Sequence, residues 1–539
     1  MTAPTRFLLL LSTAVTTSCW TPTYSRESAD AQVYPILARA AERVSGVSKT
    51  FRIERPIDTL RNKLLETTEP VQLSLLEALD VAAENSRSFQ AQKEQLYLSA
   101  LNLTRSEHEF ALKFGGGGSA DMEGVSDDTA DAILRDDLSA SLNTVAGTRL
   151  VASFVNTFLR SVVNGGTFDG SSILDLTLTQ PLLRGSGSRI VREPLTQAER
   201  NVIYQMRSFE FFRSDFATRV VSDYFSVVRQ MQDRQNVEAN FESVRQGRVR
   251  TQEEFNAGRK TISDLGREQQ SELTAKASRV RVQSQLESAL DQFKLTLGLP
   301  VTAVVQLDPN ELEKLTARGV VAFDLPETEA IEIALQRRLD HRTVLDQVAD
   351  ASRRVAVSED ALEMGLDFTA ALSVPSESGN GLNLDWSRVN WSAGFDLDLA
   401  LDKLVERNAY RSSLISLDAQ IRARENSEDS IAAEVRSALR TIDSAYDSYL
   451  IEKEALQVAQ TRVESTTELY NAGRTQALEV IDAKDSLLSS QLQLTAAIVN
   501  YAIARIELLR DLGGLAMEPK GLRFDPALPI PKVEAEETP

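Results

Sequence analysis

Cysteine and histidine are almost absent from this chain of 539 residues, which has one cysteine, Cys19, and two histidines, His108 and His341. A single cysteine excludes a disulfide within the chain. So few of these side chains leave little from which to build a zinc site or a histidine-based catalytic centre. We therefore expect no metal, no cofactor and no catalytic residues, and we interpret both histidines as ordinary surface positions on helices.

Other shortages narrow the class of protein. Aromatic residues make up 6% of the chain, with only 25 Gly and 16 Pro, a composition that suits long helices better than a loop-rich enzyme. Neither a phosphate-binding loop nor a Ser or Cys nucleophile with a suitable base occurs. Acidic residues outnumber basic ones, 78 to 59, which argues against a nucleic-acid partner. Beyond the N-terminus we find no candidate for a membrane-spanning helix, which needs about 20 apolar residues.

Residues 1–19 resemble a signal peptide. Arg6 supplies positive charge, residues 7–15 form a short apolar core, and small residues precede Cys19. A cysteine directly behind a signal core is similar to the lipoprotein signals of bacterial envelope proteins, in which the cysteine is acylated and becomes the mature N-terminus. We favour lipidation of Cys19, although Thr16 stands where such signals usually have Leu. The alternative is cleavage by an ordinary signal peptidase after Ala31.

Proline is missing from two long blocks, residues 195–299 and 376–518. Because proline breaks helix interiors, and apolar residues recur here in steps of three and four, both blocks are predicted to be helical. Each is interrupted once, by FNAGR at 255–259 and by YNAGR at 470–474. A glycine there can take the left-handed backbone that ends a helix. We therefore predict two antiparallel coiled-coil hairpins, the first arm about 100 Å long at 1.5 Å per residue.

The two hairpins are similar in sequence at a constant offset. Leu297-Gly298, at the end of the first, returns 215 residues later as Leu512-Gly513, the same offset as the two tips. Upstream, EALDVA at 77–82 resembles EAIEIA at 329–334, and each is expected to open a helix of roughly forty residues. A register kept over this length indicates a two-fold internal repeat.

The sequence therefore predicts a chain organised around two repeats. The expected parts are a signal peptide (1–19), a linker or equatorial segment (20–70), a first repeat (71–300, with a β-hairpin at about 108–183), a linker (301–325), a second repeat (326–515, with a β-hairpin at about 366–402) and a disordered tail (516–539).

Between the helices the periodicity changes to two. Apolar residues alternate with Asp, Ser and Thr in 174–179, 368–374 and 391–399. Such strands suit either a soluble half-buried sheet or a membrane barrel with a wet interior, and the signal peptide favours the barrel. We expect about four principal strands, although 110–158 is long enough for more. A closed membrane barrel takes at least eight strands, so the chain must pool strands with copies of itself.

These features resemble the TolC-type family of outer-membrane efflux proteins over residues 71–515. The motifs that carry the resemblance are the two NAG tips, LTQPLLRG at 178–185, LGLP at 297–300 and RNAYR at 407–411. The resemblance implies an α+β membrane protein in which long α-helical coiled-coil hairpins form an α-barrel tunnel. It also implies a homotrimer whose transmembrane β-barrel has twelve strands, located in the bacterial outer membrane with the tunnel in the periplasm.

The resemblance also implies a function, that of the passive exit duct of a tripartite efflux or type I secretion system. The implied partners are two further copies of the chain, a periplasmic adaptor (membrane fusion) protein, an inner-membrane RND or ABC pump, and outer-membrane lipid. The adaptor is expected at the helix tips, at Asn256, Ala257, Gly258, Arg259, Asn471, Ala472, Gly473 and Arg474.

In the same family, acidic side chains narrow the periplasmic mouth of the tunnel. The matching residues here are Asp264, Glu479 and Asp482. Relatives also place an Arg past the second tip, where this chain has Thr475 directly after Arg474. Without the resemblance, Glu479 and Asp482 are interpreted as a solvated acidic pair. The alternative function is a periplasmic coiled-coil scaffold without a pore.

Overall fold

The computed structural model describes residues 21–45, 51–55, 59–66, 70–125, 129–161, 169–308, 310–317, 319–377, 380–518 and 521–524. The chain forms two compact units. The first comprises residues 1–51, 95–206 and 343–424, and the second comprises 52–94, 207–342 and 425–539. The predicted signal peptide, with Cys19, lies outside the described residues.

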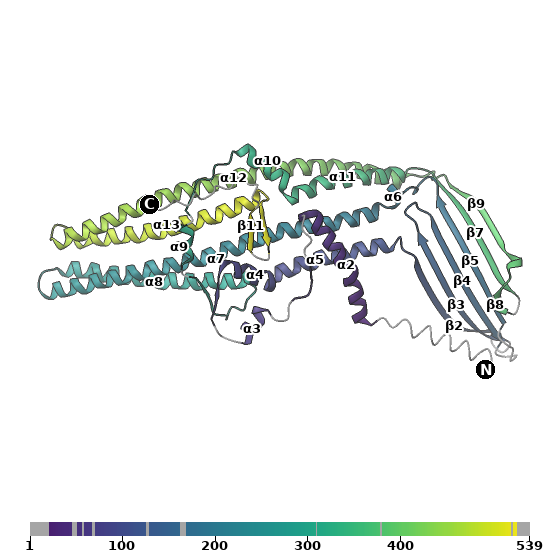
Figure 1. Ribbon diagram of the computed structural model, residues 1–539, viewed down its shortest axis with the longest axis horizontal. Coiled ribbons are helices and arrows are strands. Elements are labelled where there is room, and N and C mark those ends of the chain that lie inside the picture. Colours follow the sequence, from purple (N-terminus) through teal and green to yellow (C-terminus); the bar gives the residue numbers. More distant parts are fainter. Residues whose placement is uncertain are drawn as a thin grey trace. The chain divides into compact units, whose positions relative to one another are not determined.

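The first unit is dominated by one antiparallel sheet (Figure 1). Its strands are β2 (Lys113–Val125), β3 (Thr129–Asn143), β4 (Arg149–Ser161), β5 (Asp169–Pro181), β7 (Gly365–Glu377), β8 (Asn380–Leu384) and β9 (Asn390–Asp398). The spatial order is β2-β3-β4-β5-β7, after which β7 pairs with both β8 and β9. The short 3-10 helix η1 (Trp386–Arg388) lies between β8 and β9 in sequence.

The prediction of about four principal strands is wrong. Six long strands, β2, β3, β4, β5, β7 and β9, make up the sheet beside the short β8, and the segment expected to hold a single hairpin holds two. The alternation of apolar and polar residues did not reveal β2, because this strand contains four consecutive glycines, Gly115–Gly118, which interrupt the pattern.

The sheet has one apolar and one polar face. In register across five strands lie Ala140, Ala152, Leu176, Leu372 and Trp391, with Trp391 78% exposed. The residues between them along the strands are mostly Asp, Ser and Thr, among them Ser139, Asp175, Thr177 and Ser373. This is the two-sided pattern of a barrel that faces lipid on one side and water on the other.

Helices complete the first unit. These are α2 (Pro22–Ser45), α6 (Ser188–Val191) and parts of α5 (Arg87–His108), α7 (Glu193–Asn256), α11 (Leu339–Asp360) and α12 (Leu404–Asn471). α2 is tied to α5 by the Tyr97 hydroxyl, which donates to Asp30 at 2.6 Å. At the sheet's helical end, Arg184 and Asp398 form an ion pair at 2.7 Å.

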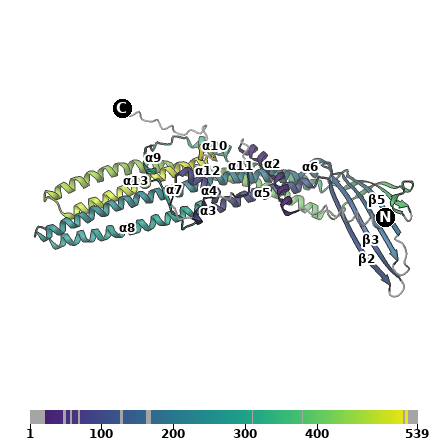
Figure 2. The same cartoon turned by 60° about the horizontal axis from the view of Figure 1, so that its bottom comes forward.

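The second unit contains the rest of the long helices and the short elements between them. α7 and α8 (Ile262–Leu297) form one hairpin, α12 and α13 (Ala477–Asp511) the other, and both views show their turns at the same end (Figures 1 and 2). The short elements are α3 (Leu60–Glu66), α4 (Leu75–Asn85), α9 (Glu311–Ala317), α10 (Glu327–Arg337), β1 (Val71–Leu73), β6 (Val305–Leu307), β10 (Leu515–Glu518) and β11 (Gly521–Phe524). β1 and β6 pair in parallel.

The expected forty-residue helices upstream of each hairpin are each two helices. α4 and α5 are separated at Ser86, and α10 and α11 at Arg338. Both breaks lie against a glycine that ends a hairpin: a Cβ on Gly298 would be 2.4 Å from the Asn85 carbonyl oxygen, and one on Gly513 would be 3.1 Å from the Arg337 Cβ. The missed breaks are thus set by long-range packing, which local periodicity does not reveal.

A buried core joins α10, α12 and α13 through Ala330, Val435, Ile442, Tyr501 and Leu508. This core explains why α13 is so apolar. Among the described residues, α13 alone is long and apolar enough to cross a membrane, with a mean hydropathy of 1.3 over its most apolar window. The expectation that no segment would pass that test is therefore wrong, and 44% of this apolar window is buried inside the protein.

Two further expectations are corrected. His341 is 4% exposed, and its Nδ1 lies 3.1 Å from the Ser427 hydroxyl; the partner is 86 residues away, so a surface position was the wrong inference. The tail is not disordered from residue 516, because β10 and β11 form an antiparallel pair. Proline-rich composition does not exclude a short backbone-paired hairpin.

Candidate functional site: the helix tips

The tips of the two hairpins have the same backbone. Gly258 and Gly473 have φ of 71° and 70°. In each tip the amide that follows the glycine donates a 2.8 Å hydrogen bond to the carbonyl five residues earlier, from Arg259 to Glu254 and from Arg474 to Leu469. This bond is the Schellman closure of a helix. A Cβ on either glycine would meet nothing within 4 Å, so glycine is needed for backbone conformation and not for space.

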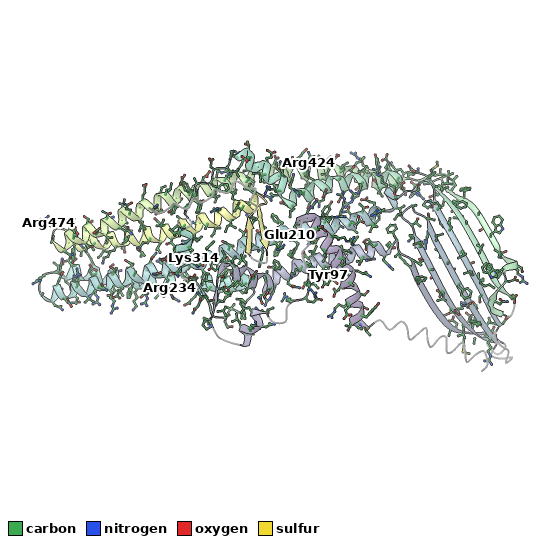
Figure 3. All side chains as sticks on the ribbon, in the orientation of Figure 1. Tyr97, Glu210, Arg234, Lys314, Arg424 and Arg474 are labelled. Carbon is green, nitrogen blue, oxygen red and sulfur yellow. The ribbon has the colours of Figure 1, made fainter. Side chains whose placement is uncertain are left out.

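The residues predicted to meet an adaptor are open to solvent. All eight positions, 256–259 and 471–474, are exposed, and Figure 3 shows Arg474 at the turn between α12 and α13. The turns close through backbone bonds, and of the tip side chains Asn256 and Asn471 accept hydrogen bonds from Gln252 and Arg250.

The two tips touch one another. Lys260, just after the first tip, places its ammonium 4.1 Å from the ring centroid of Tyr470, just before the second. This distance is within the range of a cation–π contact. A guanidinium nitrogen of Arg250 also lies 3.4 Å from the Asn471 side-chain oxygen. The sequence analysis did not find these contacts, because they join residues more than 200 positions apart.

Asp264 has a defined local role. Thr261 and Asp264 form a capping box at the start of α8: the Asp264 carboxylate accepts from the Thr261 hydroxyl at 2.7 Å and from its amide at 3.1 Å. These hydrogen bonds hold the pKa of Asp264 below its usual value. The side chain predicted to narrow the mouth is therefore a helix cap that stays ionised.

Glu479 and Asp482 are exposed on the first turns of α13. Asp485 continues the row one turn further. Burial, and then the charge of Asp482, raise the pKa of Asp485. The row therefore contains three carboxylates at intervals of three residues, of which the sequence analysis found two; the repeated spacing was the signal that could have revealed the third.

Two further charged side chains lie between the helices near the tips. Glu268 of α8 is 7% exposed, and Lys484 of α13 donates to the Ser243 carbonyl of α7 at 3.3 Å. Burial raises the pKa of Glu268, although the charge of Lys484 opposes that shift, and burial lowers the pKa of Lys484. Lys484 thus links the two hairpins through its hydrogen bond to α7, and its charge acts on Glu268 in surroundings where unpaired charge is costly.

Comparison with known proteins agrees with this architecture. The Outer membrane efflux protein family matches residues 330–514. Outer membrane protein TolC of Escherichia coli is 22% identical over 364 residues, which cover 65% of this chain and 71% of that protein. TolC of Salmonella enteritidis is 24% identical over 347 residues, covering 63% and 68%.

Solved structures share the fold. The CmeC outer membrane channel of Campylobacter jejuni superposes with a TM-score of 0.61 at 15% identity, covering 81% of this chain and 85% of that one. VceC of Vibrio cholerae gives 0.62 at 13% identity, covering 81% and 96%. The chain therefore matches the Outer membrane efflux protein family over residues 330–514, is similar in sequence to TolC, and shares the fold of solved outer membrane channels.

Proposed function

We propose that three copies of this chain form a passive outer-membrane duct coupled to a periplasmic adaptor and an inner-membrane pump. The observation that carries the proposal is the sheet of the first unit. One face presents large exposed apolar side chains such as Phe114, Trp391 and Phe395, and the other is polar. Within the described residues the long strands β2 and β9 each have one unpaired edge, and the short β8 pairs only with β7. An open edge is not tolerated in lipid. Joining copies edge to edge closes the sheet.

The two-fold repeat supports the same proposal. The structure repeats its glycine stops at Gly298 and Gly513, with φ of 73° and 70°, and packs each against the break upstream of its hairpin. We infer that residues 71–300 and 326–515 are duplicated units. Three chains would then supply six similar helical hairpins, a number suited to a closed tunnel.

The tips are the proposed site of adaptor docking and gating. Exposed side chains at 256–259 and 471–474 would meet the adaptor, and the acidic row at Glu479 and Asp482 would narrow the mouth, with Asp264 as a fixed charge. Opening would then be a shift between two arrangements that the adaptor biases. Because the apolar sheet face needs lipid to cover it, nothing favours a soluble scaffold.

The proposal is tested on the purified mature protein. We expect a detergent-dependent trimer that carries ionic current in planar bilayers, and crosslinking in intact envelopes should recover an adaptor and a pump. Substitution of Arg259 and Arg474 by Glu should weaken adaptor recovery without changing the trimer. A water-soluble monomer that forms no pore would overturn the proposal.

A further inference from the structure

The hairpin formed by β2 and β3 is an addition to the paired strands β4–β5 and β7–β9. β3 pairs with β4 without interruption from Asp131 opposite Ser161 to Asn143 opposite Arg149. The outer edge of β4 is therefore occupied along its whole length. A barrel built only from β4, β5, β7 and β9 would have to break this ladder, and the open edges of the sheet are instead β2 and β9.

The added hairpin continues the apolar face of the sheet. Met122 and Phe114 of β2 are 74% and 78% exposed. Their cross-strand partners are Ala132 and Ala140, and Ala140 in turn opposes Ala152 of β4. The apolar side chains of β2 therefore lie on the same face as those of the other strands. A soluble flap would have no reason to keep this match.

The opposite face of the hairpin is polar. It carries Lys113, Ser119, Asp121 and Glu123 on β2, and Asp131, Arg135, Asp137 and Ser139 on β3. On the apolar face a polar pair joins the two strands: the Asn156 side-chain amide of β4 donates to the Asp136 carboxylate of β3 at 2.7 Å, and Asn156 is only 5% exposed. The hairpin thus has the alternation required of a barrel wall.

The hairpin is also anchored at the helical end of the sheet. The turn between β3 and β4 brings the Thr148 hydroxyl into a hydrogen bond with the Gln180 side chain. A Cβ on Gly147 in that turn would lie 3.0 Å from Pro181 and 3.2 Å from the Gly185 carbonyl oxygen. The β3–β4 turn therefore packs directly on the junction that leads into α6, which fixes the hairpin to the wall.

Strand direction permits closure. All neighbours in the path from β2 to β9 are antiparallel, and six strands is an even number, so β2 and β9 run in opposite directions. A neighbour's β2 can therefore pair antiparallel with β9. We propose that β2 of each copy pairs with β9 of the next, so that the trimer closes an eighteen-stranded barrel in place of a twelve-stranded one.

This inference rests on the proposed trimeric duct, and it adds the number of strands that each copy contributes to the barrel. Because barrel diameter grows roughly linearly with strand number, the barrel would be about 1.5-fold wider than one of twelve strands. β2, with 13 residues, and β9, with 9, are about as long as the ~9–11 residues that cross a bilayer.

Disulfide crosslinking distinguishes the two barrels. Ala120→Cys on β2 is combined in turn with Trp391→Cys, Ala393→Cys or Phe395→Cys on β9, three positions that cover the possible registers on the apolar face. The matched control places the first cysteine on β4 instead, as Ala152→Cys with the same three β9 variants. The parent chain, with Cys19 alone, reports background crosslinking. Outer membranes are oxidised and run on non-reducing denaturing gels.

We expect a covalent trimer from at least one β2–β9 pair and monomers from every β4–β9 pair. A covalent trimer from a β4–β9 pair would overturn the proposal. So would the absence of every crosslink in a protein that is trimeric on native gels and conducts in bilayers, and in that case the proposed duct would stand. A protein that neither assembles nor conducts would count against the proposed function itself.

Discussion

Single glycines show how backbone conformation and packing make different demands. Gly298 and Gly258 have nearly the same φ, 73° and 71°. A Cβ on Gly258 would meet nothing within 4 Å, whereas one on Gly298 would be 2.4 Å from the Asn85 carbonyl oxygen. Gly258 is therefore required by its dihedral angle alone, and Gly298 both by its dihedral angle and by the close approach of Asn85.

Gly298→Ala is therefore expected to destabilise the protein by about 2–5 kcal/mol, from left-handed strain of ~1–2 kcal/mol together with overpacking of ~1–3 kcal/mol. Gly258→Ala carries the strain alone and should cost about 1–2 kcal/mol. Denaturant unfolding followed by circular dichroism in detergent compares the two variants. Equal losses would mean that the contact with Asn85 can relax.

Asp233 of α7 is 7% exposed, and burial raises the pKa of its carboxyl to about 6, although Arg229 at 3.6 Å opposes the shift. Between the ordinary value of 3.8 and about 6, the folded chain binds more protons than the unfolded chain. The free energy of unfolding therefore falls as pH rises through this window.

Asp233→Asn should remove that decline and stabilise the protein at pH 7 by about 1–3 kcal/mol, at ~1.4 kcal/mol per unit of pKa. Melting temperatures measured between pH 4 and 7 test the slope. Glu242→Gln, which removes an exposed carboxylate from the same helix, is the control and should retain the wild-type slope. A slope as steep in Asp233→Asn as in the wild type would assign the pH dependence to other carboxyls with raised pKa, such as Glu268.

At the scale of elements, the break between α10 and α11 is held by Arg338. Its guanidinium contacts Asp340 at 2.7 Å and Glu434 of α12 at 2.5 Å, and its side chain is 8% exposed. Burial opposes the charge, but the hydrogen bonds that Arg338 donates to both carboxylates outweigh burial and raise the pKa of Arg338. The arginine therefore stays charged and joins α12 to the start of α11.

Arg338→Ala should destabilise the second unit by about 1.5–3 kcal/mol, because it removes the charge-assisted hydrogen bonds of a buried guanidinium, whereas Asp340 and Glu434 are 40% and 52% exposed. Arg436→Ala is the matched control, since Arg436 also pairs with an acid across the same elements, Glu327 at 3.0 Å, but both side chains are about half exposed. That loss should be under about 1 kcal/mol. Comparable losses in thermal unfolding would contradict the role assigned to burial.

The features that the sequence predicted are those set by local chemistry. The tips followed from Gly258 and Gly473, and the long helices from the absence of proline, because helix ends and helix interiors are decided within a few residues. What the sequence did not reveal depends on distant partners. The break at Ser86 packs on Gly298, and Lys260 reaches Tyr470 only once both hairpins are folded.

The same contrast applies to the sheet. β7 and β9 were visible as alternating segments, whereas β2 has Gly115–Gly118 in place of apolar residues. A Cβ on Gly115 would lie 2.8 Å from the Ser139 hydroxyl, and one on Gly117 would lie 2.7 Å from the Asp137 carboxylate. These glycines therefore leave space for side chains of β3. The glycines of β2 are explained by its pairing with β3 and not by a pattern within β2 itself.

At the scale of the whole molecule, threefold symmetry would multiply the acidic row of α13. Glu479 and Asp482 of three copies would place six carboxylates around one opening, with Asp485 of each copy adjacent. Like charges gathered in a constriction attract cations and raise one another's pKa. Within a single chain, burial is the main cause of the raised pKa of Asp485, and the neighbouring charge of Asp482 adds to it.

The closed duct should therefore be blocked by multivalent cations. Glu479→Ala combined with Asp482→Ala is expected to weaken the block in planar bilayers by about tenfold, equivalent to ~1.4 kcal/mol. In the unaltered protein the block should weaken as pH falls, because carboxylates with raised pKa, such as Asp485, are protonated first. Glu468→Gln, which neutralises an exposed acid on the other arm of the same hairpin, is the control for general loss of charge. If the double variant is blocked as strongly as the wild type, the acidic row is not the constriction.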